Sequence, residues 1–146
     1  MKTPRIELEP GEDILAIAHA SFRGAAATSV RATFTLGSAR ARNRAFAAWQ
    51  DAALASGFPT VPPDMYVAVT ETRVLFGKPT FWGGRPKTFW STLDIDKIAK
   101  VAIVRHGFVI GVAFAMTHGS IVELEAVRTR KLRRAVRMIE ARLTYK

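Results

Sequence analysis

Two pairs of carboxylates have a spacing that could support acid–base chemistry. Asp94 and Asp96 are two residues apart, and so are Glu123 and Glu125. On a β-strand, residues at this spacing lie on one face, where one carboxylate could act as an acid and its neighbour as a base. The outer face of an antiparallel sheet is normally polar. We therefore expect both pairs to be solvated surface groups and not a catalytic site.

The histidine and cysteine content also argues against catalysis. His19, His106 and His118 are far apart, and none has a histidine or carboxylate three or four residues away, the helical spacing of a zinc site. The chain has no cysteine, which excludes disulfides, zinc–thiolate sites and a cysteine nucleophile. It also lacks the nucleophile elbow, the P-loop and the dinucleotide fingerprint. We expect no enzyme activity, no metal and no cofactor.

Basic residues concentrate at the start of two predicted helices. Arg40, Arg42 and Arg44 fall in the first turns of one helix. The other helix begins with Arg128, Arg130, Lys131, Arg133 and Arg134, and Arg137 follows one turn later. A helix N-terminus is already positive, so each added cation costs about 0.3–1 kcal/mol unless an anion is present to accept hydrogen bonds. This placement predicts an anionic or protein partner; the alternative is an ordinary solvated face of a docked helix.

Length and composition fit one folded domain. The chain has 146 residues, of which 49% are hydrophobic and 23% charged, and a domain of this size buries roughly 70% of its unfolded surface. Residues 1–10 contain no apolar run typical of a signal peptide, and residues 107–122 are too short and polar to span a bilayer. We expect a cytoplasmic protein. A net charge of +10 favours acidic partners.

The first half of the chain predicts two strands and a helix. Residues 14–23 form an apolar run after a turn cluster, and residues 30–36 alternate between apolar and polar side chains. Residues 39–56 are rich in alanine and have helical periodicity, with Phe46 and Trp49 on the apolar stripe. The prolines of residues 58–64 predict a loop, with Phe58 as a cap on the same core.

The second half predicts an antiparallel meander followed by a helix. The expected strands are residues 65–70, 72–77, 88–95, 100–106, 108–117 and 120–126. The helix, residues 128–144, has apolar residues on one side and Arg130, Arg133, Arg134 and Arg137 on the other. Serial strands closed by one amphipathic helix indicate an α+β domain.

Small residues gather on one face of two predicted strands. They are Ala16, Ala18 and Ala20 in the first, and Gly111, Ala113 and Ala115 in the other. Such faces let another backbone approach closely. The candidate neighbours are the helix of residues 39–56 or a second copy of the chain, which would make a homodimer.

Several short segments occur in an informative order. They are LEPGE at residues 8–12, YVAVT at 66–70, RVLF at 73–76, LDIDKI at 93–98 and THGS at 117–120, followed by the closing helix. This order resembles the small bacterial proteins with a pleckstrin-homology-like (PH-like) fold seen in actinobacteria. Thr70 and Arg73 occupy the family's threonine and arginine positions. The similarity covers residues 8–17 and 65–146.

The resemblance implies a fold and a general role. The implied fold is an antiparallel β-sandwich or partly open barrel capped by the C-terminal helix, forming one domain over residues 1–146. Residues 24–64 depart from the family pattern as an insertion of a strand and a helix. Family members bind phosphoinositides, peptides or proteins, so the resemblance implies binding and not catalysis.

A glycine-rich loop is a second candidate site. Residues 77–87 contain Lys78, Arg85, Lys87, Phe81 and Trp82. The basic residues resemble the lysine-spacer-basic-x-basic arrangement of phosphoinositide-binding PH domains, and the aromatics could enter a membrane interface or stack on bases. Alternatively, Trp82 packs on Trp90 across a hairpin.

We therefore expect a non-enzymatic PH-like binding module whose basic surface holds an anionic ligand or a protein. One alternative is a nucleic-acid-associated protein; because helix-turn-helix, zinc-finger and RNP signatures are absent, such binding would be nonspecific. The other is a small homodimeric structural or assembly protein.

Overall fold

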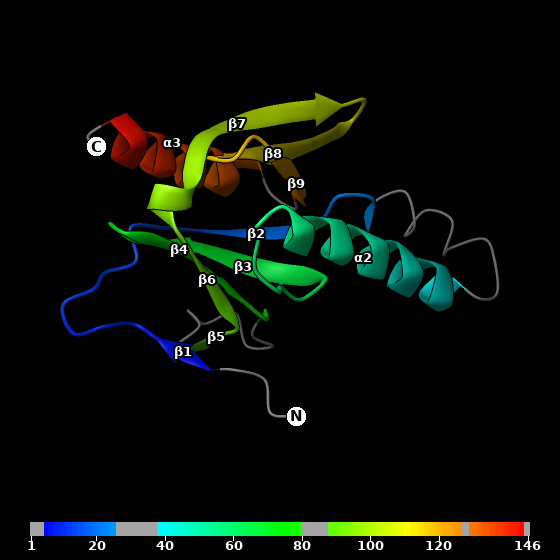
Figure 1. The fold of residues 1–146 in the computed structure, drawn as a ribbon, viewed down its shortest axis with the longest axis horizontal. Coiled ribbons are helices and arrows are strands. Elements are labelled where there is room, and N and C mark those ends of the chain that lie inside the picture. The colour runs from blue at the N-terminus through cyan, green and yellow to red at the C-terminus, as the bar shows by residue number, and fades with distance from the viewer. Residues whose placement is uncertain (1–4, 26–37, 80–87, 127–128, 145–146) are drawn as a thin grey trace.

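The computed structural model describes residues 5–25, 38–79, 88–126 and 129–144. Figure 1 shows strands arranged around a common core, with one helix against them and another projecting from one end. The strands are β1 Ile6–Glu7, β2 Ala16–Phe22, β3 Asp64–Val69, β4 Arg73–Gly77, β5 Thr88–Phe89, β6 Ser91–Asp94, β7 Ile98–His106, β8 Val109–Met116 and β9 Ile121–Ala126. The helices are α2 Ser38–Ala55, α3 Thr129–Thr144 and the short 3-10 helix η1 Ile95–Lys97.

Seven strands form one antiparallel sheet in the order β6-β4-β3-β2-β9-β8-β7. β2 pairs with β3 on one side and with β9 on the other, so it joins the β3–β4–β6 half to the β7–β8–β9 half. The end strands β6 and β7 are consecutive along the chain and connected by η1. The predicted α+β class is confirmed: among the described residues the strands form an antiparallel sheet that does not close into a barrel, and the C-terminal helix packs against it.

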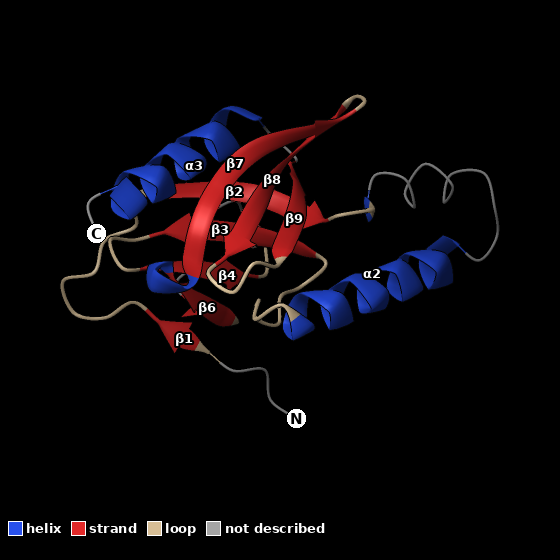
Figure 2. Ribbon diagram, turned by 45° about the horizontal axis from the view of Figure 1, so that its top comes forward, coloured by secondary structure: helices blue, strands red, loops and turns tan. Residues whose placement is uncertain are grey.

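The main core lies between the inner face of the sheet and α3 (Figure 2). The predicted amphipathic pattern of α3 is confirmed: the residues that it buries are Leu132, Ala135, Val136 and Ile139. On β2, alternate residues Ala16, Ala18 and Ala20 are buried in the same cluster. Because α3 packs against both β2 and β7, it caps the two halves of the sheet together.

That packing corrects the interpretation of the alanine face. Neither the helix of residues 39–56 nor a second copy covers Ala16, Ala18 and Ala20; α3 does. Position 111 requires a glycine for a different reason: a Cβ there would collide with the carbonyl oxygen of Leu124 on β9.

The outer face of the β2–β3–β4 region carries a second, smaller core. Ala68, Leu75 and Phe89 are buried there beneath Ile6, Leu8, Ile14 and Ile17. The pair β1–β5, which contributes two of these residues, was not predicted. The predicted strand 88–95 is instead interrupted at Trp90, whose backbone N–H donates to the Phe76 carbonyl at 2.7 Å.

α2 lies between β2 and β3 in the chain and confirms the helix predicted over residues 39–56; that it is an insertion relative to the family stays a prediction. Its end is a glycine cap: Gly57 has φ +85° and the Phe58 N–H donates to the Ala53 carbonyl at 2.9 Å. Phe58 is buried in the main core, and Trp49 stacks against it edge-on. The predicted strand 30–36 lies outside the described residues.

Candidate functional site

Four arginines share one exposed face of α3. Arg130, Arg133, Arg134 and Arg137 are all exposed, and their spacing of three, four and seven residues places them side by side on a helix. We call this set the α3 arginine face. Because the opposite side of α3 is buried, the face is held on a docked helix.

The charge on α3 is strongly one-sided. The helix contains six basic residues and one acidic residue, Glu140. The ion pairs between described residues involve Arg23, Arg42, Arg73 and His106, and none includes the α3 arginine face. Like charges at these spacings repel by about 0.2–0.5 kcal/mol per pair. An anion bound there would relieve that repulsion.

The arginines at the start of α2 do not point to one place. Arg40 and Arg44 are exposed and one turn apart. Arg42 instead donates to both carboxylate oxygens of Asp64 on β3, at 3.0 and 2.9 Å, and lies 5.5 Å from the centre of the Phe22 ring. Arg42 therefore fastens α2 to the sheet, and anion binding by this cluster stays a prediction.

The glycine-rich loop is described only at its start. Lys78 is exposed directly after β4. Trp82, Arg85 and Lys87 lie outside the described residues, so their grouping with Lys78 stays a prediction.

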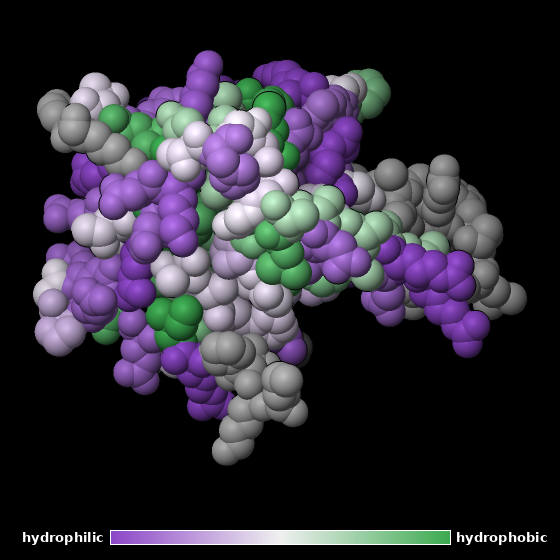
Figure 3. All heavy atoms as spheres, viewed as in Figure 1, coloured by the Kyte–Doolittle hydropathy of each residue, from purple (hydrophilic) through white to green (hydrophobic). Residues whose placement is uncertain are grey.

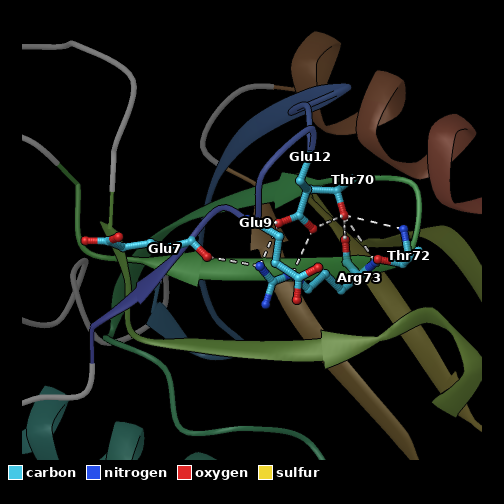
Figure 4. A network of polar contacts seen from close by, with 6 residues as sticks. All are labelled: Glu7, Glu9, Glu12, Thr70, Thr72 and Arg73. Carbon is cyan, nitrogen blue, oxygen red and sulfur yellow. Dashed lines mark hydrogen bonds and ion pairs between the residues drawn. The ribbon is translucent and has the colours of Figure 1, made fainter.

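A partly buried ionic network joins the segments that carry the family resemblance (Figure 4). Arg73 donates to both carboxylate oxygens of Glu12, at 2.6 and 2.9 Å, and to the Glu7 carbonyl at 3.1 Å. The fully buried Thr70 donates to the same Glu12 carboxylate at 3.0 Å. The hydrogen bond from Arg73 is the main cause that holds the pKa of Glu12 at about 2, below its ordinary 4.5; the same bond raises the pKa of Arg73.

This network is structural and not an anion site. It ties the chain ahead of β2 to the β3–β4 turn, more than 50 residues away in sequence. The adjoining hollow has a volume of about 270 Å³, and four of its eight lining residues are acidic, namely Glu9, Glu12, Asp13 and Glu71. Sequence reasoning missed the contact, although Thr70 and Arg73 were singled out as family positions.

The paired carboxylates of β9 lie on one face, as predicted, but the expectation that they are solvated is wrong for Glu125. Its side chain is buried and accepts from the Gly24 N–H at 2.7 Å and from Arg23 at 3.2 Å. Glu123 lies 3.4 Å from Arg23 and 3.0 Å from the Nε2 atom of His106. These carboxylates anchor the end of β2 to β9.

The other pair, Asp94 and Asp96, does not share a strand face, because Asp96 lies in η1. Within residues 5–25, 38–79, 88–126 and 129–144, no group of three or more histidine, aspartate or glutamate side chains is arranged to hold a metal ion.

Neither α2 nor α3 is long and apolar enough to cross a membrane, nor is any other helix among the described residues.

Comparisons with known proteins add little. No family model matches the sequence, and no curated protein matches it either. A solved structure with local similarity is the complex of PDZ-RhoGEF DH/PH domains with GTP-gamma-S activated RhoA, at 16% identity and a TM-score of 0.35. The match covers 57% of this chain and 25% of that chain. At this TM-score the likeness carries no argument; the strand order establishes an antiparallel α+β architecture.

Proposed function

We propose that this chain is a non-enzymatic, PH-like binding module that holds an anionic partner on the α3 arginine face. The single observation that carries the proposal is the set of four exposed arginines on one side of a docked helix, none of them paired within the described residues. Guanidinium groups suit phosphate and carboxylate ligands because they donate in a planar fork.

The fold supports this role because it presents the face rigidly. α3 is fixed in the core by Leu132, Ala135, Val136 and Ile139. Its backbone is therefore already ordered, and binding a partner costs little additional conformational entropy of the helix. A cytoplasmic setting and kinship with actinobacterial PH-like proteins are further parts of the proposal, and the family resemblance supports both.

The engagement of the candidate acid–base groups supports a binding role over catalysis. Glu125 already accepts from Arg23 and Gly24, and Glu123 is shared between Arg23 and His106. A general base needs a free position within hydrogen-bond reach of its substrate.

The test compares two variants with the same change in charge. R130Q/R133Q/R134Q/R137Q removes the α3 arginine face, and R5Q/K97Q/K100Q/R105Q removes four exposed cations that belong to none of the candidate sites. On a heparin column the α3 variant should elute at clearly lower salt than the control, because clustered charges bind a polyanion together. Equal elution of the two variants would contradict the proposal. Lipid, phosphopeptide and nucleic-acid probes at physiological salt then identify the partner class.

A further inference from the structure

α2 has one face against the body of the molecule and another that faces outward. On the inner face, Gln50 and Ala53 are buried, and the Nε1 atom of Trp49 donates to the Glu123 carbonyl at 3.0 Å. The outward face is a row of exposed residues, whose spacing of four, three, four and three places them along one side of a helix. They are Arg40, Arg44, Ala47, Asp51 and Leu54. We call this set the α2 seam.

The α2 seam lies on a helix that projects from the body. Figures 1 and 2 both show α2 extending past the strands toward its N-terminal end. In Figure 3 the part of α2 nearest the sheet is mostly green and pale, whereas purple hydrophilic atoms gather toward the N-terminal end. Leu54, the apolar residue of the seam, is 48% exposed. The seam is therefore accessible, with an apolar side chain near one end and cations at the other.

Charge is distributed unequally along the seam. α2 has no acidic residue in its first turn and no basic residue in its last. Of the ion pairs between described residues, the one on α2 joins Arg42 to Asp64, and none uses Arg40, Arg44 or Asp51. The helix dipole adds positive charge at the arginine end and negative charge at the other. The seam is thus positive at one end and negative at the other.

A surface with this charge pattern is complementary to itself when it runs in the opposite direction. Two α2 helices can pair antiparallel about a two-fold axis near Ala47, which makes every contact twice. The two arginines of each seam then lie beside Asp51 and the negative helix end of the other copy. Leu54 lies against the methylene stem of Arg40 of the other copy. A polyanion would match the arginine end alone, whereas a second copy matches both ends.

We propose that the α2 seam is the contact between two copies of this chain, which pair antiparallel through α2. The inference goes beyond the proposed function and does not depend on it, because the α3 arginine face lies on the other helix. Pairing also accounts for arginines at a helix N-terminus, where the dipole of their own helix disfavours them. Burial of Leu54 is not screened by salt, but the attraction between Arg44 and Asp51 is, so added salt weakens the dimer.

Sedimentation velocity over a dilution series tests the apolar contact. The mass of the parent chain should approach twice that of one copy as concentration rises. L54S should lower the association constant roughly tenfold, since both copies lose a buried side chain. The matched control is F108S. Phe108 lies at the end of the β7–β8 hairpin, beyond the pairing of β8 with β9, and its relative exposure is 107%; this variant should associate like the parent.

An exchange of charge tests the antiparallel arrangement. R40E/R44E makes the seam acidic throughout, and D51K makes it basic throughout, so each variant alone should be monomeric. An equimolar mixture of the two should form a heterodimer, because an acidic seam then meets a basic one. Circular dichroism of each variant confirms that it is folded. R130Q/R133Q/R134Q/R137Q should dimerise like the parent, which separates this inference from anion binding by α3.

Several results would overturn the inference. A parent chain that stays monomeric at about 1 mM would exclude the dimer. Dimers of R40E/R44E or D51K as tight as those of the parent would show that copies meet through another surface, and so would a stronger loss from F108S than from L54S. Monomeric single variants whose mixture does not associate would exclude the antiparallel pairing. Growth beyond dimers would contradict a contact closed by a two-fold axis.

Discussion

Arginine has opposite roles in two regions of this molecule. At the β3–β4 turn, Arg73 is largely buried and holds Glu12 through two short hydrogen bonds. On α3, four arginines are exposed and have no acidic partner among the described residues. The paired Arg73 stabilises the fold, but its charge is not free to bind a partner. The exposed arginines of α3 keep their charge available for a partner. A net charge of +10 therefore does not by itself show where an acidic partner would bind, because some arginines are paired within the fold and others are exposed.

The largest expected effect comes from removing the buried arginine. Arg73→Met leaves the Glu12 carboxylate buried without its cation, and the free energy of unfolding should fall by about 3–5 kcal/mol. Urea denaturation measures this loss. The double variant E12Q/R73M should recover part of it because no charge is then stranded. A loss below about 1 kcal/mol for Arg73→Met would show that the network contributes little.

A smaller effect should follow from acid. The pKa of Glu12 is about 2 in the folded protein against 4.5 ordinarily, so the folded state prefers the charged form. This contribution is complete above about pH 5 and is lost as the pH falls toward 2; we expect about 2 kcal/mol, since water still reaches one edge of the pair. Denaturation curves recorded across that range should show the loss in the parent chain. The E12Q variant should not show this loss of stability over the same pH range, because it has no carboxylate at position 12 to protonate.

The smallest effect should have the opposite sign. R130Q/R133Q/R134Q/R137Q removes repulsion between neighbouring cations and no internal ion pair, so thermal stability at low salt should rise by a few tenths of a kcal/mol. Added salt should reduce the difference in thermal stability between this variant and the parent, because it screens the repulsion between the arginines. A marked loss of stability would mean that these arginines support the fold, and the contrast with Arg73 would then disappear.

The sequence predicted those features that depend on local periodicity. α3 was recognisable because Leu132, Val136 and Ile139 recur at helical spacing, and α2 because Gly57 ends its alanine-rich run. The meander was recognisable because its strands follow one another through tight turns. The basic face of α3 followed from the same periodicity, since an apolar stripe leaves its arginines on the other side.

Features that depend on distant contacts were not predictable. Glu12 and Arg73 meet only because the chain ahead of β2 folds over the β3–β4 turn. β1 and β5 are two residues each, too short to show alternation. The burial of Glu125 depends on Arg23 and Gly24 arriving from β2, and the neighbour of the alanine face depends on where α3 docks. Phe108 looked like an ordinary strand residue until the extent of the β8–β9 pairing was known.

The absence of a side chain at Gly111 has a consequence for the spacing of β8 and β9. Any larger residue would press on the Leu124 carbonyl and push β8 away from β9, just where the hairpin loses its third strand. This contact therefore fixes how closely the backbones of β8 and β9 approach each other where their pairing begins.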